Sequence, residues 1–517
     1  MKKQTKKFFA LALAATTVLS ATSFVACGGD NPETDESGRT LIRFMGWGDV
    51  YEQMIFQTMV DDFMEKYPQY NVKYIPVQGG DYAMTLKNKV KNPKEMPDVF
   101  YMPDTNFVQW ANDAGSEVML NLTPYIEKST VFSVDNVWSE AIYAYRYDEK
   151  TKQMGTGDIW ALPKDVGPYV CVYNKNLAAE SGITVIHDEQ GTFGYDPSTK
   201  TLNDQVAMTW AQYVAFCQEM SDLEGSKKVY GCANYPLDIA LRSNNADFTD
   251  ETHKNSTLNA NDYKNFAESV QFIGDLVNEY KVMPQDGANK DTTVEAQAIN
   301  RFQNGTAGVL WTGAWYTNTL WTSNFDWDIL PVPVPNESGN LTATSEPARE
   351  GCEGRSYLGS VGLAVYAGSK VKEGAYLLAE YLTVDPEAQK VNYQLGMAVP
   401  NLVDMAKGEF LTATLNDSKG FNRPQNRKVY IDVIENSLRR IHAYTYDDKW
   451  TDELFNSSVN DYKYSMQRVW SSTYGTPIKV YNYATGVQNK DFLAGIYTNV
   501  QAALDKNKNK YEWKVNS

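Results

Sequence analysis

The residues best suited to binding chemistry lie at positions 301–318, in the stretch RFQNGTAGVLWTGAWYTN. The apolar run at 307–310 predicts a strand, and Gly313 lets the backbone turn before a helix begins. Trp311 and Trp315 flank this turn. An indole held at the end of a strand offers a flat face that can stack on the C–H side of a sugar ring. The alternative is that both tryptophans belong to the core, as most tryptophans do.

Sugar recognition also needs polar groups that bond to hydroxyls, and three aspartates occur at suitable places. Asp49 and Asp104 each follow a predicted strand, and Asp165 lies in the stretch KDVGPY. A charged acceptor roughly doubles the strength of a hydrogen bond. Arg355 and Tyr357 precede a later predicted strand and complete the candidate set. Other roles fit equally, because Asp at a strand–helix junction often caps the helix, Asp165 can shape a turn, and Arg355 can form a surface ion pair.

The sequence contains no recognised motif for catalysis. Its three histidines are far apart, and neither HExxH nor GxSxG occurs. Residues 505–509 (DKNKN) resemble the start of a calcium loop, but a lysine follows where the loop requires glycine. We therefore expect no metal and no cofactor. A glycoside hydrolase needs only two carboxylates across a cleft, so a secreted carbohydrate-active enzyme remains an alternative.

Strands and helices alternate along the first part of the chain. In order, the patterns predict a strand at 41–47, a helix at 51–67, a strand at 70–77, a helix at 82–91, a strand at 98–102 and a helix at 107–113. Such an order indicates an α/β fold with a largely parallel sheet, whose solutes bind beyond the carboxyl ends of the strands. Trp47, Asp49 and Asp104 are expected at those ends.

The N-terminus has the pattern of an export signal. A basic start precedes an apolar segment at 8–19, which is shorter than the ~20 residues that span a bilayer. The stretch FVAC at 24–27 resembles a bacterial lipobox, in which cleavage precedes the cysteine and acyl chains such as palmitate attach there. We expect a lipoprotein signal peptide at 1–26, a lipid anchor at Cys27 that holds the exported protein at the membrane, and a tether at 27–38. The alternative is an ordinary signal peptide with an unmodified cysteine.

The chain is strongly acidic, with 48 Lys and Arg against 64 Asp and Glu. Four lysines leave with the signal peptide, so 44 bases face 64 acids and the mature net charge is −20. This charge disfavours nucleic acid as a partner. Cys171, Cys217, Cys232 and Cys352 are too few for a disulfide framework, although a single bridge between the middle two is possible. The length of 517 residues predicts two or more domains.

Several short motifs occur in one characteristic order. They are the strand ending at Trp47, PDV at 97–99, DIWALP at 158–163, KDVGPY at 164–169, YNK at 173–175, a helix beginning near Trp210, FxxGxA at 302–307, GAW at 313–315, strands at 328–332 and 361–366, and DPEA at 385–388. Together they resemble the extracellular solute-binding proteins of family 1, the sugar-binding receptors of ATP-binding cassette (ABC) importers. The resemblance covers roughly residues 40–402, and the order of the motifs makes it specific.

The resemblance implies a type II periplasmic-binding-protein-like fold, with two α/β lobes joined by crossing strands and a ligand cleft between them. Lobe 1 is expected at 39–169 and 332–395, and lobe 2 at 175–327 and 400–517, the latter with a helical C-terminal extension. Crossings are expected near 169–173, 329–332 and 396–400. A hairpin at 191–200 and a polar loop at 336–355 are expected as additions.

The resemblance also implies roles for individual residues. Trp315 matches the aromatic residue of the GAW-type motif and is expected to stack on the solute. Trp311 and Tyr316 are its expected neighbours, Trp47 is expected to face it from the other lobe, and Tyr169 lies at the first crossing.

The implied function is capture of a carbohydrate, of oligosaccharide size, by closure of the lobes and its delivery to the membrane permease of an ABC importer. We expect the receptor to act as a monomer. The alternatives are the enzyme named above and a receptor for a non-sugar solute. An anion receptor would need basic residues or bare helix N-termini at its site.

Overall fold

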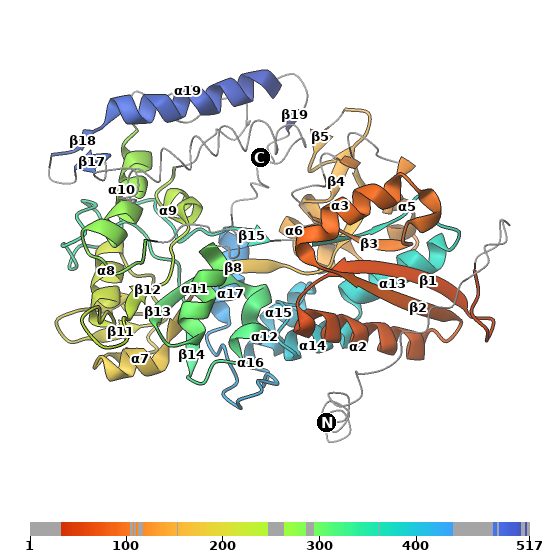
Figure 1. The fold of residues 1–517 in the computed structure, drawn as a ribbon, viewed down its shortest axis with the longest axis horizontal. Coiled ribbons are helices and arrows are strands. Elements are labelled where there is room, and N and C mark those ends of the chain that lie inside the picture. The colour runs from red at the N-terminus through yellow and green to blue at the C-terminus, as the bar shows by residue number, and fades with distance from the viewer. Residues whose placement is uncertain are drawn as a thin grey trace.

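The computed structural model describes residues 33–103, 107, 110–111, 117–151, 153–246, 263–285, 294–359, 361–437, 479–482, 485–507 and 512–513. The signal peptide, Cys27 and Asp104 lie outside these residues. The chain forms two lobes that lie side by side, each with its own sheet and hydrophobic core, and β8 (Gly167–Asn174) runs between them (Figure 1). The predicted two-lobe α/β fold is confirmed.

Lobe 1 is built on a five-stranded sheet with the order β2-β1-β3-β16-β7. Its strands are β1 (Thr40–Trp47), β2 (Tyr70–Val77), β3 (Val99–Pro103), β7 (Ala161–Pro163) and β16 (Val361–Val365). Its helices are α2 (Val50–Lys66), α3 (Gly79–Val90), η1 (Pro93–Glu95), α5 (Thr123–Ile126), η3 (Val134–Asn136), α6 (Ser139–Tyr143), α13 (Lys372–Val384) and α14 (Pro386–Gln394). Because β1 pairs in parallel with both β2 and β3, the parallel sheet predicted for the start of the chain is confirmed.

A small second sheet accompanies lobe 1. It contains β4 (Arg146–Asp148), β5 (Gln153–Met154), β6 (Asp158–Ile159) and β19 (Glu512–Trp513). The last strand, β19, pairs in parallel with β5, so the expectation that residues 400–517 lie in lobe 2 is wrong for this strand.

Lobe 2 is built on a sheet with the order β12-β13-β8-β14, and β15 also pairs with β8. The remaining strands are β9 (Thr184–Ile186), β10 (Tyr195–Asp196), β11 (Thr201–Asn203), β12 (Tyr230–Cys232), β13 (Ala307–Gly313), β14 (Trp327–Leu330), β15 (Leu358–Gly359), β17 (Tyr481–Asn482) and β18 (Val487–Gln488). The helices are α7 (Lys175–Glu180), α8 (Trp210–Glu219), α9 (Leu237–Ser243), α10 (Lys264–Asn278), α11 (Val294–Gln303), η5 (Ala314–Tyr316), α12 (Thr317–Leu320), α15 (Val403–Lys407), α16 (Glu409–Thr412), α17 (Lys428–Asn436) and α19 (Lys490–Asn507). The expected hairpin insertion is present as the antiparallel pair β10 and β11.

The chain returns from lobe 2 to lobe 1 later than the sequence predicts. After β14, Val334 pairs with Thr209, and the Arg349 guanidinium binds both carboxylate oxygens of buried Glu268 on α10, at 2.6 and 2.9 Å. The expected crossing near 329–332 is therefore wrong, and residues 332–357 lie with lobe 2 instead of lobe 1. The chain crosses between β15, which pairs with β8, and β16, which pairs with β3 and β7 of the lobe 1 sheet.

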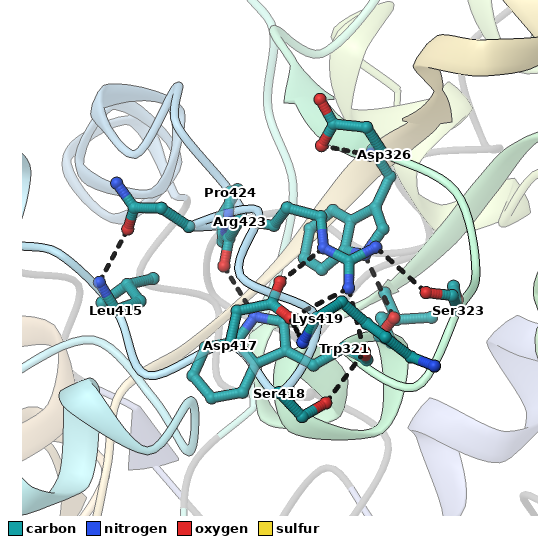
Figure 2. A network of polar contacts seen from close by, with 12 residues as sticks. Trp321, Ser323, Asp326, Leu415, Asp417, Ser418, Lys419, Arg423 and Pro424 are labelled. Carbon is teal, nitrogen blue, oxygen red and sulfur yellow. Dashed lines mark hydrogen bonds and ion pairs between the residues drawn. The ribbon is translucent and has the colours of Figure 1, made fainter.

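A buried arginine holds the segment that follows α16 to lobe 2 (Figure 2). The side chains of Arg423 and Asp417 have no exposed surface, and Nε lies 2.5 Å from one carboxylate oxygen of Asp417. The guanidinium also donates to the backbone carbonyls of Trp321, Ser323 and Phe325. Every nitrogen of the guanidinium therefore has an acceptor, which satisfies the strict demand of a buried charge for partners.

Asp328 on β14 fixes the same C-terminal segment by other contacts. One carboxylate oxygen accepts the backbone N–H groups of Gln425, Asn426 and Ile329, at 3.0, 2.9 and 2.9 Å. The side chain is buried, and burial raises the pKa of Asp328 to about 6. The folded protein therefore binds this proton more tightly than the unfolded chain does.

The stability of the protein is expected to depend on the ionisation of Asp328. Because the pKa rises from its usual value of 3.8 to about 6, protonated Asp328 stabilises the folded protein by ~3 kcal/mol. This stabilisation is fully present below about pH 4 and is lost as the pH rises through about 6. Asp328→Asn keeps an oxygen acceptor and removes the charge. Urea unfolding between pH 4 and pH 8 should show the variant gaining stability relative to wild type as the pH rises. Parallel pH profiles would contradict this expectation.

Candidate functional site

Trp315 lies where the two lobes meet. Its indole is partly exposed and packs against both hydrophobic cores. Three glycines make room for the ring: a Cβ atom on Gly167, Gly313 or Gly359 would lie 2.6, 2.2 or 2.6 Å from it. These glycines belong to β8, β13 and β15, so the ring rests on the backbones of three strands of lobe 2, of which β8 and β15 lie where the chain passes between the lobes. No residue with a side chain fits at these three positions without moving the indole.

Tyrosines surround Trp315 on the lobe 2 side. The Tyr169 ring lies 6.0 Å from the indole and stacks on the Tyr357 ring at 4.6 Å, and the Tyr316 ring lies 6.2 Å from the indole. The Tyr169 hydroxyl lies 3.2 Å from Glu295 Oε1 and 3.1 Å from a backbone carbonyl. The structure therefore brings together Trp315, Tyr316, Tyr169 and Tyr357, with Tyr169 itself buried, and contact of these residues with a solute stays a prediction.

Trp311, by contrast, belongs to the core of lobe 2. Its side chain has no exposed surface, and Nε1 donates to the Tyr213 hydroxyl at 3.3 Å. The expectation that Trp311 contacts the solute is wrong in this conformation. The reason is its place inside β13, where the indole packs against Tyr235 at 4.8 Å, whereas Trp315 lies beyond the end of the strand. Of the two tryptophans that flank Gly313, Trp311 is therefore the one that belongs to the core.

Trp47 occupies the end of β1 in lobe 1. It is partly exposed, and its ring contacts the edges of Tyr82 at 4.6 Å and Tyr101 at 5.0 Å. Packing requires Gly46, because a Cβ atom there would meet the Tyr101 ring at 2.8 Å, and the positive φ of 155° favours glycine at position 48. Trp47 thus lies at the carboxyl end of a parallel strand, where the sequence places it.

Asp49 has two roles. Its side chain accepts the backbone N–H of Glu52 at 2.8 Å and so caps α2, as the alternative reading proposed. Its second oxygen accepts a hydrogen bond from the Thr319 hydroxyl at 2.9 Å. Thr319 lies on α12, so this bond joins lobe 1 to lobe 2 directly.

Asp165 belongs to a buried ionic cluster. Lys164 Nζ lies 2.6 Å from Asp165 and 2.8 Å from Glu52 Oε1, and the ammonium lies 5.2 Å from the Tyr101 ring. Burial alone would lower the pKa of Lys164, but the carboxylates of Asp165 and Glu52 outweigh it and raise that pKa. Burial also raises the pKa of Glu52, although Lys164 opposes this change. Sequence reasoning missed Glu52 and Lys164, since no local pattern shows that α2 meets residue 164.

Glu295, at the start of α11, also escaped sequence reasoning. It is half-buried, and burial raises the pKa of its carboxylate although a hydrogen bond from Tyr169 opposes this. Burial, followed by the charges of Glu295, Asp49 and Glu52, raises the pKa of Tyr316 to about 12. Tyr316 therefore lies within the field of carboxylates from both lobes.

Arg355 forms a surface contact. Its guanidinium lies 3.2 Å from Glu353 and donates to Asn245 at 3.2 Å. This is the ion pair that the alternative proposed, and among the described residues the guanidinium of Arg355 forms no hydrogen bond with the aromatic group around Trp315.

A family model described as "Bacterial extracellular solute-binding protein" matches residues 49–390. The search of curated proteins found no match. Among the described residues, no helix combines the length and the apolar character needed to cross a membrane.

Solved structures share the fold. The chain is similar to the ABC substrate-binding protein Lmo0181 from Listeria monocytogenes, in complex with cycloalternan (18% identity, TM-score 0.62, covering 90% of this chain and 99% of that one). It is also similar to the GacH receptor of Streptomyces glaucescens, described unliganded and with acarbose (17%, 0.61, 91% and 99%). A third similar structure is UgpB from Mycobacterium tuberculosis in complex with glycerophosphocholine (15%, 0.59, 91% and 100%).

Proposed function

Because this chain belongs to the bacterial extracellular solute-binding protein family, we propose that it captures a carbohydrate of oligosaccharide size between its lobes and delivers it to the membrane permease of an ABC importer. The observation that carries the proposal is Trp315, a partly exposed indole that rests on three glycines where the lobes meet. Trp47 supplies a second partly exposed indole from lobe 1. Flat aromatic faces with carboxylates beside them suit a ring that carries C–H patches and hydroxyls.

The chemistry around Trp315 favours a sugar over an anionic solute. Two of the similar structures hold cycloalternan and acarbose, whereas the third holds glycerophosphocholine, which carries a phosphate. A phosphate would need a free cation or a bare helix N-terminus. Lys164 is already bound by two carboxylates, and Asp49 occupies the N-terminus of α2. The family and these neighbours are solute-binding proteins, so we propose no catalytic role.

Transport requires that the bound solute contact both lobes. A solute that contacts both lobes stabilises the closed conformation through the contacts that it makes only in that conformation. The permease then recognises the closed conformation. The hydrogen bond between Thr319 and Asp49 adds a protein contact between the lobes. We further propose that the receptor is a monomer held at the outer face of the membrane by acyl chains on Cys27.

A panel of neutral mono- and oligosaccharides tests the proposal by thermal shift. A ligand at a hundred times its dissociation constant should add ~2.7 kcal/mol of stability, which gives a clear rise in melting temperature. Any hit is then incubated with the protein and analysed by chromatography, where we expect it to remain intact. Hydrolysis of the hit would favour the enzyme, and the absence of any sugar hit would contradict the proposal.

A further inference from the structure

One carboxylate among the aromatic side chains of lobe 2 forms no ion pair with any residue that the structure describes. Glu295 is half-buried at the start of α11, and in the described part of the chain its bonding partner is the Tyr169 hydroxyl, at 3.2 Å. Its charge also acts on Tyr316 and Tyr357, the other tyrosines beside Trp315. The carboxylate thus lies beside the tyrosines that surround Trp315, the indole that the proposed function assigns to the solute.

In the described part of the chain, carboxylates outnumber the cations near these rings. Lys164 lies between Glu52 and Asp165, at 2.8 and 2.6 Å, so that cluster has one positive and two negative charges. On the other side, near Tyr357, the buried cation Arg242 is accompanied by Asp238. Asp49 adds a further carboxylate from lobe 1.

We propose that Glu295 determines the charge of the solute: it accepts a hydrogen bond from a hydroxyl or an ammonium group of the bound glycan, and it excludes glycans that carry carboxylates or other anionic groups. This inference rests on the proposed function. It goes further by restricting the substrate class to neutral and basic carbohydrates. The physical reason is that an anionic group of the solute would enter a partly dehydrated surrounding in which carboxylates outnumber cations, and it would be repelled there.

The Tyr169 hydroxyl explains how Glu295 can serve a solute. This hydroxyl lies within hydrogen-bond distance of both Glu295 and the Trp311 carbonyl, and it has one hydrogen to donate. When it donates to the carbonyl, Glu295 is left to accept a hydrogen bond from the sugar. A carboxylate offers four lone-pair sites in total, so it can also accept from Tyr169 and from a sugar hydroxyl together.

The test uses the neutral oligosaccharide that gives the largest thermal shift and two derivatives of it, one with primary hydroxyls oxidised to carboxylates and one with amines there. Calorimetric titration should show that wild type binds the carboxylate derivative at least tenfold more weakly than the parent oligosaccharide. The amine derivative should bind about as tightly as the parent or more tightly. Glu295→Gln keeps the shape of the side chain and removes the charge. In this variant the ratio of the dissociation constant of the carboxylate derivative to that of the parent should fall about tenfold.

Glu224→Gln is the matched control, because it changes the net charge by the same amount at an exposed position. The ratio of the two dissociation constants in this control should equal that of wild type. The inference is overturned if wild type binds the carboxylate derivative as tightly as the parent, or if Glu295→Gln leaves the ratio unchanged. Both results would leave carbohydrate capture intact. If no carbohydrate binds at all, the proposed function fails and this inference fails with it.

Discussion

Replacing Trp315 with alanine is expected to weaken carbohydrate binding more than any other single change in the chain. Stacking of a planar ring on an aromatic side chain contributes ~1–3 kcal/mol, which corresponds to a loss of about five- to 150-fold in affinity. The indole also rests on Gly167, Gly313 and Gly359, so its loss leaves a gap beside β8, β13 and β15. Calorimetric titration with the best hit from the panel measures the loss directly.

Gly359→Ala provides a second variant that keeps the indole and displaces it. The new Cβ atom would lie 2.6 Å from the Trp315 ring, which is closer than packed atoms allow. We expect this variant, like Trp315→Ala, to bind the carbohydrate more weakly than wild type. Circular dichroism should show that the protein without ligand is folded. If both variants fold and retain wild-type affinity, Trp315 is not the stacking residue.

Arg423→Met should produce the largest loss of stability. The change leaves the Asp417 carboxylate buried without its partner, and three backbone carbonyls lose their donor (Figure 2). Breaking a buried ion pair in this way costs ~3–5 kcal/mol. For a lobe of this size each kcal/mol lowers the melting temperature by ~2–4 °C, so we expect a fall on the order of 10 °C in a thermal scan.

Two further variants separate the buried ion pair from charge in general. Lys428→Ala removes an exposed pair with Asp432 one helical turn away, and it should change stability by less than ~0.5 kcal/mol. The double variant Arg423→Met with Asp417→Leu removes both buried charges and should be more stable than Arg423→Met alone. A double variant as unstable as the single one would show that the carbonyl contacts, not the buried charge, hold this segment.

Local sequence patterns were sufficient for the elements that carry the site. The alternation of strands and helices predicted β1, α2 and β2, because each buries a face at its own period. The GAW motif placed Trp315 just beyond β13, where the structure has it. The same argument was wrong for Trp311, since nothing local distinguishes an indole inside a strand from one after it.

The remaining predictions depended on contacts between residues that are far apart in the sequence. The contact between Arg349 and Glu268 joins residues 81 positions apart, and it keeps the chain in lobe 2 past the expected crossing. Glu295 meets Tyr169 across 126 positions, and Glu52 meets Lys164 across 112. A carboxylate in a sequence of 64 acids gives no sign of such partners. The fold of this chain brings these groups together, and only the fold reveals them.

Small-angle X-ray scattering of the protein with and without its best carbohydrate hit tests the central claim, that a sugar held between the lobes draws them together. We predict a smaller radius of gyration at saturating sugar for wild type. Trp315→Ala at the same sugar concentration should show little or no decrease. An unchanged radius of gyration in wild type, under conditions where calorimetry shows the sugar bound, would contradict the account.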